Sequence, residues 1–578
     1  MKRVIGLMLV VSILLSVVTF AVGAKGKSDV TPVIFLSGYS SSSLFTDFGT
    51  EDQKQVWLFS KDDALAEVKK NIPQIVFALF RSFTGRPEAF GEQFADAVQE
   101  LLPALFNNPD GTSVYDVQPW PNEPKLSTYN YLKSAKEDEI DEVALSAYVA
   151  DKIGGDNTFV FHYDFRFGGY DNAELLKKYA DKVLAFTGSD KVSFFGHSYG
   201  GFVIATYLSM FGDENKTKNV VLDVPALGGT SFARRFFEGD VDLSMYELVT
   251  LGETLLGSET NFAGFFDPDS GMGPINQTAS AFLTSVRAMP IYYGSLWDLL
   301  TPDDYTAMKE KYLDPVENAE IIKESDLTHY KFMKNYHETF TKLQKNGTDI
   351  SIICNYGSHS AFGGEKINDM LLDAERTSGA ICKDFGERFE DGYKCAYTVC
   401  KNKSHNHLSP SMEIDASAAY LPEDTWFIKG QCHGCYPNDP YSLSLIEKLL
   451  FANEKTDIYT YPEYPQFNTS RCPHYGVYAE FDSSKPGYLG EKDKALVITN
   501  ISSKKVTVTD VSFDGADISF KLPKKAVVLE PGKSVTVEFT GDVPKATAKH
   551  ATVTVNFFKF TWGKMFSSRT FDIQINRK

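Results

Sequence analysis

The pattern of hydrophobic and polar positions changes along the chain, and its first long part alternates between two kinds of segment. Short apolar runs such as Pro32–Leu36 and Thr158–Phe161 have the length and composition of buried strands. Between such runs, a segment such as Ala173–Phe186 places its apolar residues at helical spacing. This alternation across residues 31–230 predicts an α/β fold, in which a parallel sheet carries helices on both faces.

Two later parts of the chain have different patterns. Residues 231–348, ahead of the strand-like run Asp349–Cys354, contain helical patches and many aromatic side chains. We expect either a cap over an apolar substrate or a set of packing helices without a substrate role. From about residue 488, short β-branched runs such as Ser534–Phe539 are separated by turn residues. This pattern predicts an immunoglobulin-like β-sandwich over 488–578, as an accessory module.

The N-terminus is typical of an exported protein. A basic segment, Met1–Arg3, is followed by an apolar run, Val4–Phe20, and then by small residues ahead of Lys25. This arrangement predicts a signal peptide over residues 1–24, and an uncleaved membrane anchor is the alternative. We therefore expect a secreted protein, or one that is delivered to a lysosome-like acidic compartment.

The composition of the chain bears on which partners it can bind and on whether its cysteines are oxidised. The 578 residues are 43% hydrophobic, which is enough for a large core, and the formal net charge of −18 argues against nucleic-acid binding. Clustered cysteines in an exported chain predict up to three disulfides and one remaining thiol. The cysteines are Cys354, Cys382, Cys395, Cys400, Cys432, Cys435 and Cys472, and sites for glycosylation begin at Asn215, Asn276, Asn346, Asn402, Asn468 and Asn500. Nothing in the sequence indicates the oligomeric state.

Residues Gly196–Gly200 read Gly-His-Ser-Tyr-Gly and lie between a strand-like run, Lys191–Phe195, and a helix-like run, Phe202–Leu208. In that setting a Gly-x-Ser-x-Gly sequence is typical of a nucleophile elbow, a sharp turn that exposes a strained serine. The N-terminus of the helix then points at the serine oxygen and at the oxyanion that forms there. Ser198 is therefore the predicted nucleophile. The predicted fold class is an α/β-hydrolase with a large helical cap insertion, whose catalytic domain spans 25–480.

Several short motifs follow one another in a distinctive order across residues 31–450. They are Pro32–Tyr39, Trp57, Tyr163–Arg166, Val224–Thr230 and Asn355–Ser358. In order and spacing they resemble the motifs of the lecithin:cholesterol acyltransferase group, which includes the lysosomal phospholipase. One motif departs from that family, because Asp110–Val117 continues into Gln118-Pro119-Trp120 where the family has Pro-Gly-Phe-Gly. The resemblance implies acyl-enzyme chemistry on lipid esters, with a membrane or a lipid particle as a partner surface.

A serine hydroxyl needs an adjacent base, and in this fold the chain order is serine, acid, histidine. His433 is the predicted base, because it follows the strand-like run Asp424–Lys429 and precedes a helix-like run. The resemblance implies the same position for the histidine. His405 and His407 are weaker candidates, because they lie too early in the chain. Cys432 and Cys435 flank His433, and disulfides at these positions would fix the loop.

The sequence defines the acid of the predicted serine–histidine–acid triad less well than it defines the serine and the histidine. The stretch that corresponds to the family's Asp-Gly-x-Val-Pro segment is Ser404–Pro410, and it contains no carboxylate. The next acids along the chain are Glu413 and Asp415. Asp415 is the predicted acid, which would orient the base, and Asp223 is the alternative.

The oxyanion hole is predicted from the same fold. One N–H belongs to Tyr199, after the nucleophile, and the other to Tyr39, in the loop after the first strand. The polar loop Ser40–Ser43 lies beside it and is either a contact for an ester head group or a solvated loop. We interpret Asp164 and Arg166 as an internal ion pair.

Three functions are compatible with these residues. The first is a lipase or phospholipase, in which water releases the acyl group from Ser198. The second is an acyltransferase, in which an alcohol replaces water. The third is an inactive hydrolase fold that serves as a binding module. No cofactor is predicted, because the sequence shows no phosphate-cradling motif and because Cys432 and Cys435 lack a second cysteine pair at metal-ligand spacing.

Overall fold

The structure of the chain is a computed structural model, and it describes residues 30–57, 87–135, 144–242, 273–358, 364–482, 487–515, 517–541, 550–560 and 564–575. The predicted signal peptide at 1–24 lies outside these residues. Within them, none of the helices has the length and apolar character needed to cross a membrane.

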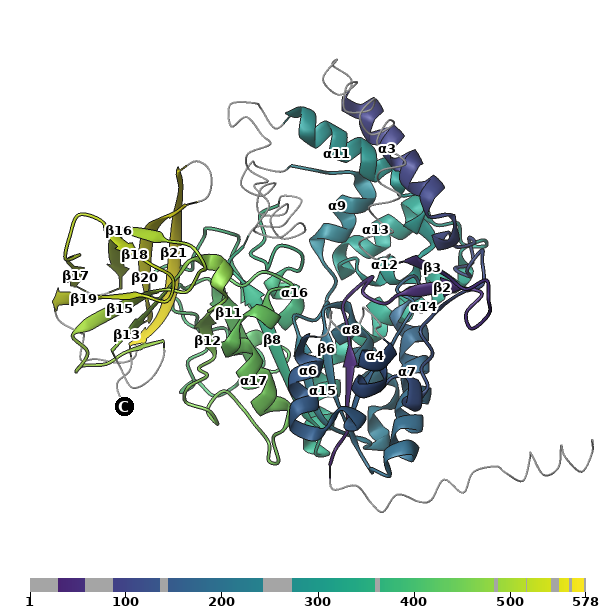
Figure 1. Ribbon diagram of the computed structural model, residues 1–578, viewed down its shortest axis with the longest axis horizontal. Helices are drawn as coiled ribbons and strands as arrows, with labels where there is room; N and C mark the ends of the chain where they lie inside the picture. Colours follow the sequence, from purple (N-terminus) through teal and green to yellow (C-terminus); the bar gives the residue numbers. More distant parts are fainter. Residues whose placement is uncertain are drawn as a thin grey trace, which may run out of the picture.

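A seven-stranded parallel sheet forms the centre of the larger part of the molecule (Figure 1). Leu36 pairs with Gly196, and His197 pairs with Asp223, so the C-terminal ends of three neighbouring strands meet at one edge. This sheet and its helices have the arrangement of an α/β-hydrolase, and the predicted fold class is confirmed. In spatial order the strands are β12 (Phe467–Thr469), β11 (Thr425–Lys429), β8 (Asp349–Tyr356), β7 (Thr217–Asp223), β6 (Val192–His197), β1 (Val33–Leu36) and β5 (Thr158–Val160).

Alternate residues of the central strands face two separate hydrophobic cores. Ile34 and Leu36 of β1 belong to one core, and Val33 and Phe35 belong to the other. Both faces of the sheet are therefore covered, which explains why its strands are continuous apolar runs in the sequence. The first core includes residues of α7 (Gly169–Thr187), α8 (Tyr199–Phe211) and α15 (Met333–Lys345), and the second includes residues of α6 (Ala144–Ile153) and α17 (Pro440–Leu450).

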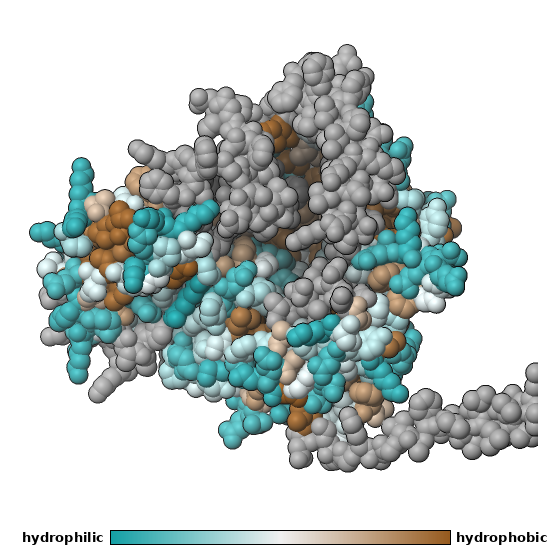
Figure 2. All heavy atoms as spheres, in the orientation of Figure 1, coloured by the Kyte–Doolittle hydropathy of each residue, from teal (hydrophilic) through white to brown (hydrophobic). Residues whose placement is uncertain are grey.

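Helices make up most of the described residues of the insertion between β7 and β8, as the sequence predicts for residues 231–348. They begin directly after the C-terminal end of β7, so they lie on the side of the sheet that holds Ser198 (Figure 1). On the face shown in Figure 2, the surface over the sheet is mostly hydrophilic, with scattered hydrophobic residues. The described helices here are α9 (Ser231–Glu238), α11 (Gly273–Val286), α12 (Gly294–Asp298), α13 (Pro302–Tyr312) and α14 (Ala319–Leu327), with a π-helix at Thr328–Phe332 before α15.

Smaller elements surround the sheet. A three-stranded sheet follows β1, and α3 packs along α11 (Figure 1). Their bounds are β2 (Leu44–Thr46), β3 (Lys54–Trp57), β4 (Val117–Pro119), α3 (Pro87–Leu101), α4 (Tyr129–Ala135), α16 (Ala374–Ser378), β9 (Ile381–Cys382) and β10 (Ile414–Asp415).

The C-terminal part is a β-sandwich, as predicted, and it begins earlier than residue 488. Its two sheets enclose one hydrophobic core that includes Phe481, Leu496, Val553 and Phe571. One sheet contains β13 (Val477–Phe481), β15 (Ala495–Asn500), β19 (Ser534–Gly541) and β17 (Ile518–Phe520); the other contains β14 (Tyr488–Leu489), β21 (Lys564–Ile575), β20 (His550–Phe560), β16 (Val506–Asp514) and β18 (Val527–Leu529).

A buried polar network joins the sandwich to the central sheet. Asp572 of β21 is fully buried, accepts a hydrogen bond from the hydroxyl of Tyr356, and lies 3.5 Å from the Nζ of Lys429. Glu413 is the second partner of Lys429, at 2.5 Å. Since Lys429 ends β11, the network fixes the sandwich to the strand that leads to His433.

Candidate active site

Ser198 lies at the sharp turn between β6 and α8. Its backbone has φ 55° and ψ −124°, which L-residues rarely adopt, and this strain is the mark of a nucleophile elbow. Glycines make the turn possible, because a Cβ on Gly200 would lie 2.4 Å from the Ser37 carbonyl oxygen. A Cβ on Gly196 would lie 2.5 Å from Ile204. The side chain of Ser198 therefore stands at the C-terminal edge of the sheet, beside the N-terminus of α8.

His433 faces Ser198 from the loop after β11. Its Nε2 lies 2.8 Å from the Ser198 Oγ, although 235 positions separate the two residues. The loop is braced at Cys432, whose N–H donates to the hydroxyl of Tyr475 at 2.6 Å. Cys432 and Cys435, which flank the histidine, form a disulfide, whereas Cys354, Cys382, Cys395 and Cys400 are thiols. The two side chains that the sequence proposed as nucleophile and base are thus in hydrogen-bond contact.

Asp369 completes the chain of hydrogen bonds. Its Oδ2 lies 2.8 Å from the Nδ1 of His433, and its carbonyl oxygen accepts the His433 N–H at 2.9 Å. A carboxylate can only accept, so Nδ1 carries the proton and Nε2 is left to accept from the Ser198 hydroxyl. The other carboxylate oxygen accepts from the N–H groups of Leu371 and Leu372, at 3.1 and 2.8 Å, which fixes its orientation.

The choice of Asp415 as the acid is wrong in this structure. Asp415 is fully buried in β10, where its carboxylate accepts hydrogen bonds from Tyr393 and from the N–H groups of Ala396 and Ser417. It helps to hold the irregular segment before β10, and Asp369 occupies the place beside His433.

The alternative acid, Asp223, pairs with another histidine. Its Oδ2 lies 2.7 Å from the Nδ1 of His197, the residue that precedes the nucleophile. The rings of His197 and His433 are 5.0 Å apart, so a second histidine–aspartate pair lies next to the first. Asp223 therefore adds negative charge near His433 without contacting it as the third member of a triad.

The position of Asp369 depends on a backbone pairing of nearby residues that cannot be recognised from the sequence. Ser358, just beyond β8, and Asn368 exchange backbone hydrogen bonds at 2.8 and 3.1 Å. This pairing brings Asp369 back to the C-terminal end of β8, where an acid belongs in this fold. The available signal was position alone: Asp369 lies between the end of β8 and β11, in the order serine, acid, histidine.

The loop proposed to supply the second oxyanion N–H packs against Ser198. A Cβ on Gly38 would lie 3.3 Å from the Ser198 Cβ. The hydroxyl of Tyr163 donates to the carbonyl oxygens of Ser37 and Gly38, both at 2.9 Å. In a trans peptide the C=O and the next N–H point in opposite directions, so the N–H of Tyr39 points away from Tyr163. Tyr163 therefore sets the orientation of this peptide.

Other residues that carry the resemblance support the same loop. Trp57 donates its indole N–H to the Ser40 carbonyl at 2.6 Å. Asp164 and Arg166 form a buried bidentate ion pair, with contacts of 3.0 and 2.7 Å, as the sequence analysis proposed. Ser42 and Ser43 are buried, so this part of the polar loop is packed rather than solvated.

A cavity of about 260 Å³ lies next to these groups. Its lining includes Gly38 from the proposed oxyanion loop, His197, and Gly434 and Tyr436 from the loop of His433. The cavity therefore borders the proposed oxyanion loop and the loop that carries His433.

The electrostatics of His433 suit a base. Burial lowers its pKa, but the carboxylates of Asp369 and Asp223 outweigh burial, so the pKa lies above the ordinary value of 6.5. The protonated imidazole that a proton transfer from Ser198 creates is thus stabilised by its neighbours.

Comparison with known proteins adds little to this picture. No protein-family model matches the chain, and no curated protein matches its sequence. Among solved structures, a Tle4–Tli4 complex aligns with a TM-score of 0.29 and 12% identity, over 74% of this chain and 100% of the other. The Bacillus licheniformis lipase BlEst2 in its propeptide form gives 0.24 and 10%, over 75% and 91%, and phospholipase PlaB from Legionella pneumophila gives 0.23 and 11%, over 77% and 86%. At these scores the fold class rests on the strand order and the elbow of this chain itself.

Proposed function

We propose that the protein is a serine hydrolase that cleaves lipid esters through an acyl-enzyme. The observation that carries the proposal is the continuous chain Asp369–His433–Ser198, with both hydrogen bonds at 2.8 Å and a strained backbone at the serine. Three groups from three distant loops meet in the geometry that nucleophilic catalysis requires.

The geometry supports a defined sequence of steps. The Ser198 oxygen attacks the ester carbonyl carbon while its proton passes to the Nε2 of His433. The oxyanion accepts hydrogen bonds from the N–H groups of Tyr199 and Tyr39. The imidazolium then gives its proton to the leaving alcohol, and the acyl group remains on Ser198. A water molecule, deprotonated by His433, releases the acid and restores the serine.

A lipid ester is the proposed substrate class. The helices between β7 and β8 lie at the edge that holds Ser198, and they reach the residue after the nucleophile, because the hydroxyl of Tyr199 donates to Asp298 of α12 at 3.1 Å. The order of motifs that resembles the acyltransferase group supports the same class. The inactive binding module loses its main support, since Asp369 supplies the acid that the sequence seemed to lack.

The proposal is tested with the purified full chain. A fluorophosphonate should label Ser198, and p-nitrophenyl esters of increasing chain length should be hydrolysed, with Ser198→Ala abolishing both signals. Long-chain esters should be preferred over acetate. Failure of the folded wild-type chain to react with the fluorophosphonate, or unchanged turnover in Ser198→Ala, would refute the proposal. Product analysis with an added alcohol would show whether acyl transfer competes with hydrolysis.

A further inference from the structure

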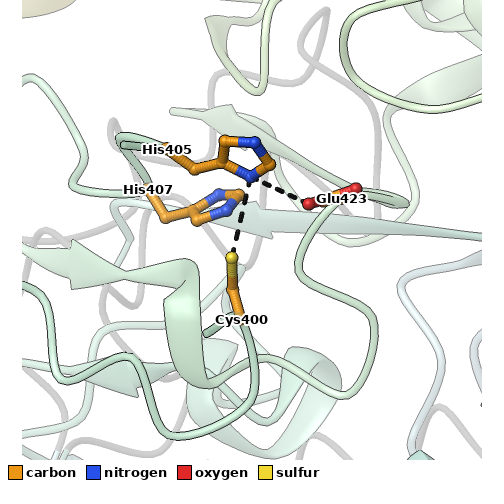
Figure 3. Close-up of side chains that lie close together, drawn as sticks. All are labelled: Cys400, His405, His407 and Glu423. Carbon is orange, nitrogen blue, oxygen red and sulfur yellow. Dashed lines mark hydrogen bonds and ion pairs between the residues drawn. The ribbon is translucent and has the colours of Figure 1, made fainter. Parts of the chain in front are cut away.

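Four side chains of types that bind metals meet near the start of β11, whereas His433 lies beyond its other end. They are Cys400, His405, His407 and Glu423, and their four ligand atoms all lie within 4.8 Å of one another (Figure 3). Cys400 and His407 are buried, whereas His405 and Glu423 are partly exposed. None of the four residues belongs to the proposed catalytic groups. One buried nitrogen in the group has no hydrogen-bond partner.

That atom is the Nε2 of His407. His407 is fully buried, and its Nδ1 lies 2.9 Å from the side-chain oxygen of Gln466. The Gln466 amide nitrogen donates to the carbonyls of Pro422 and Thr425, at 2.7 and 3.2 Å, so its oxygen is the atom that faces the histidine. The Nδ1 must therefore carry the proton, and the Nε2 presents a bare lone pair. This buried lone pair has no hydrogen-bond partner.

A histidine held in this way is pre-oriented to bind a metal. Metal-ligating histidines almost always donate their second ring N–H to a carbonyl, a carboxylate or water, which fixes the tautomer and the ring. Gln466 plays that part for His407. A buried acceptor without a partner is energetically unfavourable, and a bound cation would remove this cost.

The other three groups have a spacing that suits a tetrahedral ion. The Nδ1 of His405 lies 3.7 Å from the Sγ of Cys400 and 2.8 Å from a carboxylate oxygen of Glu423 (Figure 3). With zinc–sulfur bonds of about 2.3 Å and zinc–nitrogen or zinc–oxygen bonds of about 2.0–2.2 Å, tetrahedral ligand atoms lie roughly 3.3–3.8 Å apart. Only small shifts, such as replacing the His405–Glu423 hydrogen bond by two metal bonds, would complete the shell. The Asn402 amide at the Nε2 of His405 would turn so that its oxygen accepts the ring N–H, in exchange for the two hydrogen bonds that this oxygen accepts from Ser404.

We propose that Cys400, His405, His407 and Glu423 form a structural zinc site. One thiolate, two imidazoles and one carboxylate are the ligand types that zinc prefers, and four protein ligands close the shell, as structural sites require. Calcium and magnesium are disfavoured, because they take oxygen ligands.

The location defines what the ion would do. Glu423 lies two positions before β11 and His433 four positions after it, so the strand, roughly 15 Å long, separates the two. Residues 383–413 contain neither an α-helix nor a β-strand. The ion would fix this irregular segment, through three of its side chains, to the start of β11. It therefore contributes to stability rather than to ester cleavage, and it stands or falls independently of the proposed hydrolase activity.

The first experiment measures zinc on the full wild-type chain. Protein freed of metal with a chelator and desalted is mixed with zinc chloride, desalted again, and analysed for metal content and melting temperature. We expect about one zinc per chain and a melting temperature that rises by several degrees. Cobalt(II) should replace zinc and give visible d–d bands together with a thiolate charge-transfer band. A chain that retains almost no zinc would overturn the proposal, as would a disulfide at Cys400 detected by mass spectrometry.

The second experiment assigns the ligands. Cys400→Ser should remove the thiolate band, and His407→Gln should weaken zinc binding at least tenfold. Cys395→Ser is the matched control, because it removes a neighbouring thiol outside the cluster and should leave uptake and spectrum unchanged. The far-UV and near-UV circular dichroism of each variant shows that it is folded. Wild-type zinc content and an unchanged cobalt spectrum in both folded ligand variants would place the ion elsewhere and refute this assignment.

Discussion

At position 369, a carboxylate within a stretch that lacks a recognisable motif makes the contact on which the proposed base depends. Its hydrogen bond holds His433 in the tautomer that can accept the Ser198 proton. The amide of Asn would favour the opposite tautomer, because it can donate to Nδ1. We therefore expect Asp369→Asn to lower kcat about 10⁴-fold, as in other serine triads.

This first prediction has a built-in comparison. Asp415→Asn alters a carboxylate that only supports the segment before β10, so it should lower the melting temperature while kcat stays within a few-fold of wild type. Steady-state kinetics on one ester decide between the two aspartates. A loss of kcat in Asp415→Asn as large as that in Asp369→Asn would contradict the assignment.

Tyr163 supports a second prediction for a single residue. Its hydroxyl orients the Ser37 and Gly38 carbonyls, and thereby the N–H of Tyr39. Tyr163→Phe keeps the ring and removes the hydroxyl, so kcat should fall about tenfold, less than the 10²–10³-fold cost of losing an oxyanion donor outright. KM should change little, because the interaction strengthens only in the transition state.

Tyr179→Phe is the matched variant for Tyr163→Phe. Tyr179 is also a buried tyrosine whose hydroxyl contacts a carbonyl, that of Val160 at 3.2 Å, but it does not touch the loop beside Ser198. Its kcat should stay near that of the wild type. An equal loss of kcat in the two variants would mean that Tyr163 acts only through general packing.

The sequence predicted these residues unevenly, for physical reasons. Ser198 could be found because its sharp turn requires glycines at fixed spacing in the sequence. His433 could be found because the order of strands and helices in the fold places the base after a late strand. Asp369 could not, because its place depends on the backbone pairing of Ser358 with Asn368, which the residue types do not indicate. The cluster at Cys400 has the same character, since its ligands come from two loops that only the folded chain brings together.

At the scale of elements, the first strand and the elbow helix are in close contact beside the site. A methyl group on Gly200 of α8 would lie 2.4 Å from the Ser37 carbonyl and 2.7 Å from that of Leu36. Gly200→Ala should thus lower the free energy of unfolding by about 1–3 kcal/mol, a typical cost of overpacking. It should also slow fluorophosphonate labelling, because β1 and α8 together position Ser198.

Gly273→Ala provides the comparison at this scale, since nothing lies within 4 Å of the added Cβ at the start of α11. Chemical denaturation of both variants measures the difference. Equal stability of the two variants would show that the elbow tolerates a side chain.

The alternation of strands and helices could be predicted directly from the sequence, because each central strand is buried on both faces and is therefore a continuous apolar run.

At the scale of the whole molecule, buried acids couple stability to pH. Burial raises the pKa of Asp298 from 3.8 to about 7, and it raises that of Asp424 to about 7 as well. For an acid whose pKa is higher in the folded state, the folded chain binds more protons between the two pKa values. Stability is therefore greatest below pH 4 for these groups and declines as the pH rises from about 4 to 7.

We accordingly expect the melting temperature to be higher at pH 5 than at pH 7.5. Asp298→Asn should flatten this dependence, because the amide cannot ionise, whereas Asp116→Asn on the exposed surface should not. Ester cleavage should show the opposite trend, since only unprotonated His433 accepts the serine proton and its pKa lies above 6.5. A melting temperature that rises with pH over this range would contradict the assignment of buried acids.

The network around Lys429 gives the C-terminal sandwich an unexpected hold on the chemistry. Lys429 stands four positions before His433 and is neutralised in part by Asp572, which the sandwich contributes. Cutting away the last hundred residues would remove Asp572 and leave Glu413 as the remaining carboxylate beside the Lys429 ammonium, at the start of the loop that carries His433. The sandwich is therefore not independent of the catalytic groups, because displacing it removes a charge partner from the residue at the start of the His433 loop.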